Sequence, residues 1–114
     1  MDEMRTDMRP ADIDHVCLSG AFWGLRTQTN RTHTLGTQYD RLVETGRIAA
    51  LDPEYRPGDA AARHIFWDSD VAKWLEAACC ALRAGPDAEL AACVESTIDL
   101  LGRLQREDGY LNSW

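Results

Sequence analysis

The strongest hydrophobic pattern in the chain runs from about Ser69 to Gly85. Apolar positions recur there every three or four residues, the spacing of one helix face. A glycine and a proline follow directly at 85–86 and cannot continue a helix. The pattern predicts a helix that begins near Ser69 or Asp70 and ends at Gly85. Its apolar stripe consists of Val71, Trp74, Leu75, Ala78, Cys79 and Leu82.

A second helical pattern lies earlier in the chain. Its stripe consists of Leu35, Tyr39, Leu42 and Val43, and Gly46 follows where a C-cap glycine is expected. We therefore expect a helix from about residue 30 to residue 45.

A third helix is predicted from Asp87, as N-cap, to about Gln105. Its apolar positions cover much of the helix circumference, so it needs neighbours on two sides. These positions are Leu90, Val94, Ile98, Leu100, Leu101 and Leu104.

The remaining segments have weaker patterns. Residues 1–14 are polar and predict a loose leader, whereas residues 15–18 alternate and predict a short strand or extended segment. Phe22 and Trp23 precede Gly24, which indicates a packed turn over 21–26. Residues 47–66 contain prolines and small residues and predict a long surface connection.

The link between the second and third helices is only a few residues long. A link this short joins antiparallel neighbours. Residues 66–70 at the start of one helix and 108–112 after the end of the next should therefore share one rim.

Composition narrows the classes of function. The net charge is −7 without a basic stripe, which argues against nucleic acid or anionic lipid as a partner. No apolar run is long enough for a membrane span. The start of the sequence has no hydrophobic signal segment, so we expect a cytoplasmic protein with four free thiols.

The acidic start of the second helix could hold a pair of catalytic carboxylates. Glycoside hydrolysis needs two such groups about 5–9.5 Å apart, flanking one bond. Asp68 and Asp70 are two residues apart on a helix and point different ways, so we favour capping or helix-dipole roles. One of them could instead bind a ligand hydroxyl. Lys73 is expected to pair with Asp70, and Glu76 to face solvent.

Other residue types allow competing interpretations. Cys79 and Cys80 are adjacent on a helix and cannot easily share one tetrahedral ion, so we expect Cys79 to be buried. Trp67 and Trp74 could stack on a sugar but more often form core. The segment DGYLNSW (108–114) offers hydroxyl and amide groups that suit a polyol, or is a plain turn with Tyr110 packed. We expect surface or structural roles for His15, His33 and His64.

Three stretches resemble one enzyme family, and together they cover nearly everything from Val16 onward. FWDSDVAKWLEAACCAL (66–82) resembles the F-x-D-S-D-V-Y-K-W-L-E-A-A segment of the β-L-arabinofuranosidases of glycoside hydrolase family 127. GAFWGLRTQTNRTHTLGTQYDRLVETGRI (20–48) is similar to that family's G-x-F-W-x-x-R … Q-Y-x-x-L-E-x-x-G-R-I. PDAELAACVESTIDLLGRLQREDGYLNSW (86–114) resembles its P-D-x-E-L … I-D-L-I-x-x-x-Q-x-x-D-G-Y-L-N-T.

The resemblance implies a mainly all-α fold. Residues 15–114 would be the N-terminal part of an (α/α)6 barrel, about three helices after a short extended segment. The family's barrel has several hundred residues, so we expect the chain to be a fragment of the catalytic domain.

The resemblance also implies hydrolysis of a terminal L-arabinofuranoside from a glycan or glycoconjugate. The family uses a zinc-bound cysteine as nucleophile and a glutamate as acid/base, and these lie downstream of the matched segments. We therefore expect no catalytic residue, metal ligand or cofactor site in this chain, and no activity from it alone. Ala72 departs from the family's usual tyrosine, and Cys79-Cys80 takes the place of a small residue and a tyrosine. Residues that match the motifs and would line or support the sugar pocket are Gln38, Asp68, Ser69, Asp70, Lys73, Trp74, Asp108, Tyr110 and Asn112.

Two alternatives remain. The wide apolar helix faces could make the chain a non-enzymatic helical interaction module, which self-associates or pairs with the rest of the barrel. A thiol or metal protein is the third, weaker interpretation.

Overall fold

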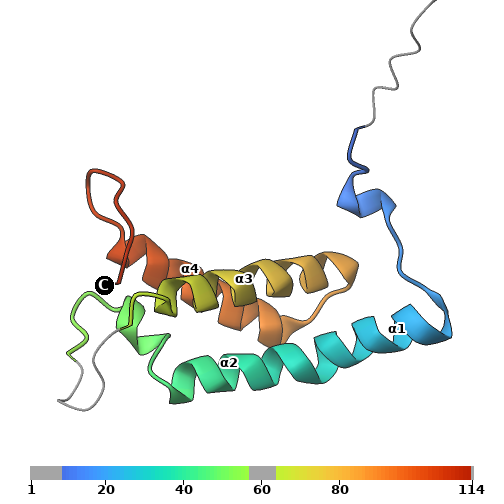
Figure 1. The fold of residues 1–114 in the computed structure, drawn as a ribbon, viewed down its shortest axis with the longest axis horizontal. Helices are drawn as coiled ribbons and strands as arrows, with labels where there is room; N and C mark the ends of the chain where they lie inside the picture. The colour runs from blue at the N-terminus through green and yellow to red at the C-terminus, as the bar shows by residue number, and fades with distance from the viewer. Residues whose placement is uncertain (1–8, 57–63, 114) are drawn as a thin grey trace, which may run out of the picture.

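The structure, a computed structural model, describes residues 9–56 and 64–113 (Figure 1). All regular secondary structure in these ranges is helical, which confirms the predicted all-α class. Eight residues of the predicted leader, 1–8, lie outside the described residues, and residues 9–12 have no regular structure.

The first helical run is longer than predicted. Helix α1 (Gly20–Thr29), the π-helical turn η2 (Asn30–Thr34) and helix α2 (Leu35–Glu44) follow without a break (Figure 1). The predicted packed turn over 21–26 is therefore wrong, and the helix begins ten residues before the predicted start. Helix α1 buries none of its residues, so it carries no apolar stripe from which its period could be recognised.

The predicted strand over residues 15–18 is also wrong. A single 3-10 turn, η1 (Ile13–His15), is followed by residues without regular structure. Val16 and Leu18 are 54% and 55% exposed, and no strand lies beside them among the described residues. Alternation alone could not supply the pairing partner that a strand needs.

The end of α2 follows the prediction. Gly46 has φ +78°, a left-handed conformation that glycine adopts without steric cost, and the Arg47 N–H donates to the Leu42 carbonyl at 2.9 Å. The predicted surface connection that follows is partly wrong, because Ala50 and Leu51 in the 3-10 turn η3 (Ala49–Leu51) are fully buried. Residues 57–63 of that connection lie outside the described residues.

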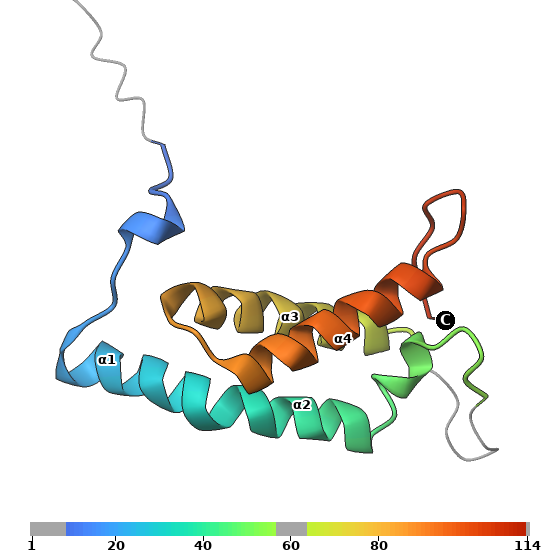
Figure 2. The same ribbon diagram turned by 180° about the vertical axis from the view of Figure 1, so that it is seen from behind.

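Helices α3 (Trp67–Ala84) and α4 (Ala88–Leu104) form the predicted antiparallel hairpin (Figure 2). The carboxylate of Asp87 accepts a hydrogen bond from the Leu90 N–H at 3.0 Å, which confirms Asp87 as the N-cap. Helix α3 begins two residues before the predicted Ser69.

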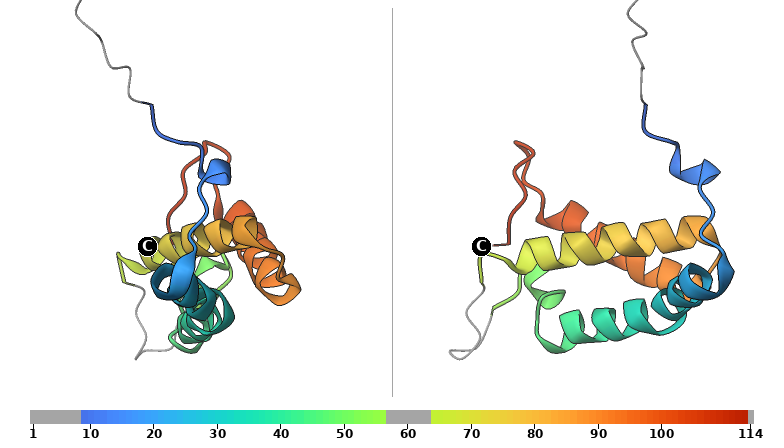
Figure 3. Two further views of the ribbon diagram at one scale, coloured as in Figure 1. Left: turned by 90° about the vertical axis from the view of Figure 1, so that its right-hand side faces the viewer. Right: turned by 45° about the vertical axis from the view of Figure 1, so that its right-hand side comes forward.

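The core lies where α2, α3 and α4 meet, as the end-on view shows (Figure 3). Trp74 is at its centre: its side chain is 3% exposed, its Nε1–H donates to the Leu35 carbonyl at 3.0 Å, and its ring lies 4.8 Å from that of Tyr39. Around Trp74 lie Leu35, Leu42, Ile48, Leu51, Val71, Ala78, Leu90 and Val94.

The buried face of α3 is narrower than its sequence pattern. Only Val71, Trp74 and Ala78 are buried, and Cys79 is exposed together with Cys80, so the predicted burial of Cys79 is wrong. On α4, Ile98 is 48% exposed. That side of α4 is not covered by any other part of the described chain.

Candidate functional site

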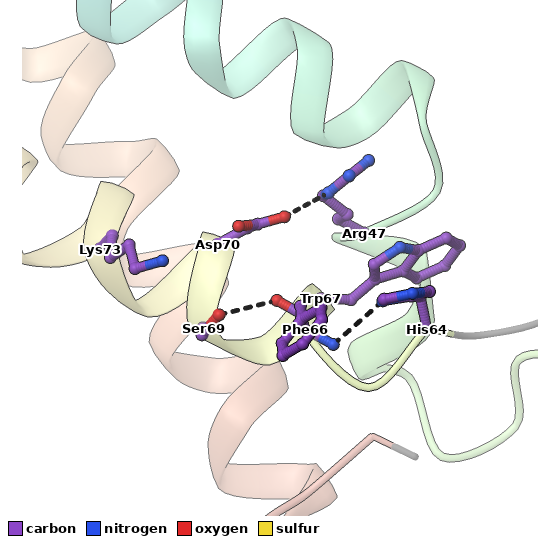
Figure 4. A pocket seen from close by; sticks show the side chains of 7 residues that line it. All are labelled: Arg47, His64, Phe66, Trp67, Ser69, Asp70 and Lys73. Carbon is purple, nitrogen blue, oxygen red and sulfur yellow. Dashed lines mark hydrogen bonds and ion pairs between the residues drawn. The ribbon is translucent and has the colours of Figure 1, made fainter.

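A pocket of about 580 Å³ lies at the start of α3 (Figure 4). The residues around it come from the turn after α2, from the turn before α3 and from the first turns of α3. They are Arg47, His64, Phe66, Trp67, Ser69, Asp70 and Lys73.

The turn before α3 satisfies the first backbone N–H groups of the helix. The N–H of Trp67 donates to the His64 carbonyl at 3.0 Å, and that of Phe66 to His64 Nδ1 at 3.3 Å. No side chain caps α3. The predicted capping role of the acidic motif is therefore wrong, although both aspartates do stand in the first turn, where the helix dipole favours negative charge. Ser69 Oγ instead donates to the Phe66 carbonyl at 2.9 Å.

Asp70 pairs across the pocket with Arg47. The Nε–H of Arg47 donates to Asp70 Oδ2 at 2.9 Å, and its guanidinium lies 5.5 Å from the centre of the Trp67 ring (Figure 4). The predicted Lys73–Asp70 pair is absent from the described part of the chain, because Arg47 takes this position.

Asp68 faces another segment. Its Oδ2 accepts the Ser113 N–H at 2.8 Å, and its Oδ1 accepts a hydrogen bond from the Ser113 hydroxyl. Ser113 is 2% exposed. The predicted shared rim is thus confirmed, because the start of α3 and the segment after α4 meet here.

The loop after α4 is a compact turn. Gly109 has φ +86°, the Arg106 N–H donates to the Tyr110 carbonyl at 2.9 Å, and the Tyr110 N–H donates to Asp108 Oδ1 at 3.0 Å. The ring of Tyr110 is 50% exposed beneath the Arg106 guanidinium, 5.0 Å away, so a packed Tyr110 is a wrong prediction. Asn112 is half-buried.

A second pocket of about 510 Å³ follows the groove between α2 and α3. Gln38 of α2 lines it, and Asp70 and Lys73 line both pockets, so the two form one continuous region along α3. Its other residues are Thr37, Arg41, Leu42, Trp74 and Ala77.

The structure therefore brings Gln38, Ser69, Asp70, Lys73 and Trp74 to the two pockets, while neither pocket includes Asp68, Asp108, Tyr110 or Asn112. Trp74 belongs mainly to the core, as expected for an aromatic residue on a helix stripe. Trp67 is the half-buried tryptophan that lines the first pocket.

In the first pocket, the predicted site residues did not include Arg47, His64 or Phe66. Arg47 follows the C-cap glycine, where the chain turns away from α2 toward α3. The position of Arg47 could have suggested a site residue only if the direction of this turn had been known. His64 was expected to have a surface or structural role, and it is indeed exposed at the turn.

Two titratable groups in the core have shifted pKa values. Burial raises the pKa of the Tyr39 hydroxyl, an effect that a hydrogen bond with Thr97 opposes. Burial, with help from the nearby carboxylates of Asp40, Glu89 and Asp87, raises the pKa of the Cys93 thiol.

Metal ligands do not gather in the described ranges: no group of three or more His, Cys, Asp or Glu side chains could hold an ion there. Cys79 and Cys80 are exposed neighbours on α3, and Cys93 is on α4.

None of the helices described is long and apolar enough to span a bilayer.

The profile of the "Beta-L-arabinofuranosidase, GH127 catalytic domain" family matches residues 15–114. This chain belongs to the GH127 family. A non-reducing end beta-L-arabinofuranosidase of Bifidobacterium longum subsp. longum is 53% identical over 49 residues, which are 43% of this chain and 7% of that protein.

The fold has a close counterpart among GH127 structures. A solved GH127 beta-arabinofuranosidase superposes with a TM-score of 0.77 at 30% identity, over 91% of this chain and 17% of that one. The GH127 fold is an (α/α) barrel, so the continuous run from α1 to α2, together with α3 and α4, forms an arc of that barrel. The chain spans less than one fifth of the length of either relative.

Proposed function

We propose that this GH127 chain forms the first helices of the catalytic barrel of a glycoside hydrolase that removes a terminal β-L-arabinofuranosyl unit from a glycan or glycoconjugate. The family match across residues 15–114 carries this proposal. The continuous pocket along α3, at the rim where the two family motifs meet, supports it.

The chemistry of the pocket suits a sugar. Lys73, Gln38 and the Ser69 hydroxyl offer donors for ring and hydroxyl oxygens, and the half-buried Trp67 offers an aromatic face. In this proposal these side chains bind and orient the substrate. Tyr110 and Asn112 lie on the loop after α4 and line neither pocket, so this proposal gives them no contact with the sugar.

Zinc would supply an activated cysteine nucleophile in the complete family domain. The described cysteines do not fit this role, since no ligand cluster surrounds them. In this proposal the chain performs no chemical step by itself and is inactive alone. All four thiols are free, which supports a place in the reducing cytoplasm.

The proposal is tested by grafting residues 15–114 onto the solved GH127 relative in place of its matched segment. The isolated chain with zinc should release no L-arabinose from an aryl β-L-arabinofuranoside, whereas the chimera should release it. A folded, zinc-loaded chimera without activity would contradict the proposal.

A matched pair of variants sharpens this experiment. Lys73→Ala in the chimera should raise KM at least about tenfold, because it removes a donor worth about 1.4 kcal/mol or more. Glu76→Ala, an exposed carboxylate one turn along the same helix, should leave the kinetics unchanged.

One observation favours the interaction module as a second candidate. Phe22, Trp23 and Leu25 on α1 are each more than half exposed, next to the exposed Val16 and Leu18. Such a patch is typical of an interface. We propose that its partner is the rest of the barrel, because the solved relative holds the same helices within a much longer chain. Sedimentation and the fluorescence of an apolar dye test the interaction module. A chain that sediments as a monomer and binds no dye would exclude it.

A further inference from the structure

The two aspartates of the Asp68-Ser69-Asp70 motif reach in different directions from one helical turn. Asp68 contacts Ser113, which follows α4, and Asp70 contacts Arg47, which follows α2. These partners lie 45 residues after and 23 residues before their aspartates in the chain.

We propose that this motif is a two-sided clamp, in which Asp68 and Asp70 are positioning residues that fix the two neighbouring segments to the first turn of α3. Calling the clamped region a substrate pocket rests on the proposed function. The clamp itself rests on the contacts alone.

Asp68 holds Ser113 with both of its carboxylate oxygens. Each carboxylate oxygen accepts one hydrogen bond from Ser113, one from the backbone N–H and one from the hydroxyl. Hydrogen bonds to an ionised acceptor are stronger than those between neutral groups. Ser113 is 2% exposed, so its donors would be left without water if Asp68 were removed. Each oxygen therefore has a partner on Ser113, and Asp68 lines neither pocket, so its role in this proposal is to position the segment after α4.

The Asp70 side holds the end of α2. Arg47 is itself fixed, because its backbone N–H donates to the Leu42 carbonyl at 2.9 Å in the turn that Gly46 permits. Its guanidinium then bridges from Asp70 to the face of Trp67 (Figure 4). The result is that Arg47, Asp70 and Trp67 are held together as one wall of the pocket.

Neither aspartate caps α3, because the helix begins at Trp67 and both stand inside its first turn. Their carboxylates are therefore available for contacts with other segments. Of the motif, Ser69 and Asp70 line the first pocket, and Lys73, one turn further along α3, lies beside them.

The test uses the isolated, isotope-labelled chain and two NMR signals, one on each side of the clamp. Asp68→Asn should raise the exchange rate of the Ser113 amide proton about tenfold, the effect of losing one charged hydrogen bond, and leave the Trp67 indole N–H signal in place. Asp70→Asn should shift the Trp67 signal and leave Ser113 exchange unchanged. Each variant is thus the control for the other.

A second pair covers the case in which an aspartate variant fails to fold. Ser113→Thr keeps both donors and should preserve slow exchange of the residue-113 amide, whereas Ser113→Ala should accelerate it. The clamp is contradicted if every variant moves both signals to the same extent, as a purely general loss of stability would, or if no variant moves either. These readouts do not depend on glycosidase activity, so the proposed function and the clamp can fail separately.

Discussion

Two tryptophans show how differently the core around α3 and the helix α1 are packed. Trp74 on α3 is 3% exposed and hydrogen-bonded to Leu35, whereas Trp23 on α1 is 56% exposed. The partners of Trp74 lie on α2 and α4 of the same chain. Helix α1 contacts mainly η2, its own continuation, and buries none of its residues. The proposal of a longer catalytic domain accounts for this difference, because other helices of that domain would cover α1.

The largest expected effect separates these two tryptophans. Trp74→Ala should lower the free energy of unfolding by about 3–5 kcal/mol, because it removes a buried ring and leaves a cavity. Trp23→Ala should change it by less than about 0.5 kcal/mol. Urea denaturation followed by circular dichroism measures both, and equal effects would contradict the contrast between the two ends.

Two glycines of the same helical region should respond with opposite signs. Gly46→Ala should cost about 1–2 kcal/mol, because φ is +78° and the new Cβ would approach the Tyr55 hydroxyl at 3.3 Å. Gly36→Ala should stabilise by about 0.4–1 kcal/mol, because this helical position is open. Melting temperatures that fall for both variants would mean that α2 is not helical at Gly36.

The starts of α3 and α4 offer a smaller contrast. Asp87→Ala should cost about 1 kcal/mol, since it removes the cap on the Leu90 N–H. Ser69→Ala should cost less than about 0.5 kcal/mol, because Ser69 caps nothing and is exposed. Thermal unfolding measures both; a larger loss for Ser69→Ala would restore the predicted cap at the start of α3.

The smallest effect concerns one thiol of the core. Burial raises the pKa of Cys93 in the folded chain, so less thiolate forms at a given pH and alkylation is slower. The rate of iodoacetamide modification of Cys93 should therefore rise at a higher pH in the folded chain than in urea. Because the unfolded chain forms the thiolate more readily, the folded state loses stability as the pH rises through the Cys93 titration. Identical pH profiles in both states would place Cys93 at the surface.

The packed helices α3 and α4 could be predicted from the sequence, whereas the exposed helix α1 could not. Helices α3 and α4 were predictable because each carries a periodic stripe and a stop or cap signal, Gly85-Pro86 or Asp87. Helix α1 was not predictable, because no described part of the chain covers its apolar side chains and they form no stripe. The burial of Ala50 and Leu51 could not be predicted, because they lie in a short segment with prolines and small residues that has no periodic pattern.

For the site, loop length alone was enough to predict the shared rim, and the aspartate motif was recognised. Its roles were not, because they depend on distant residues: Arg47 and Ser113 are aligned with Asp70 and Asp68 only after the helices pack. The cap prediction failed because α3 begins at Trp67, before the predicted start, so both aspartates stand inside its first turn and the Asp70 N–H donates to the Phe66 carbonyl at 3.2 Å. Local sequence rules could not predict this outcome.

The most direct measurement of the central claim is hydroxyl-radical labelling of Trp23 and Trp74, in the isolated chain and in the GH127 chimera. If α1 is covered by the rest of the barrel, Trp23 should be labelled rapidly in the isolated chain and strongly protected in the chimera, while Trp74 is protected in both. Equal labelling of Trp23 in the isolated chain and in an active chimera would contradict the account.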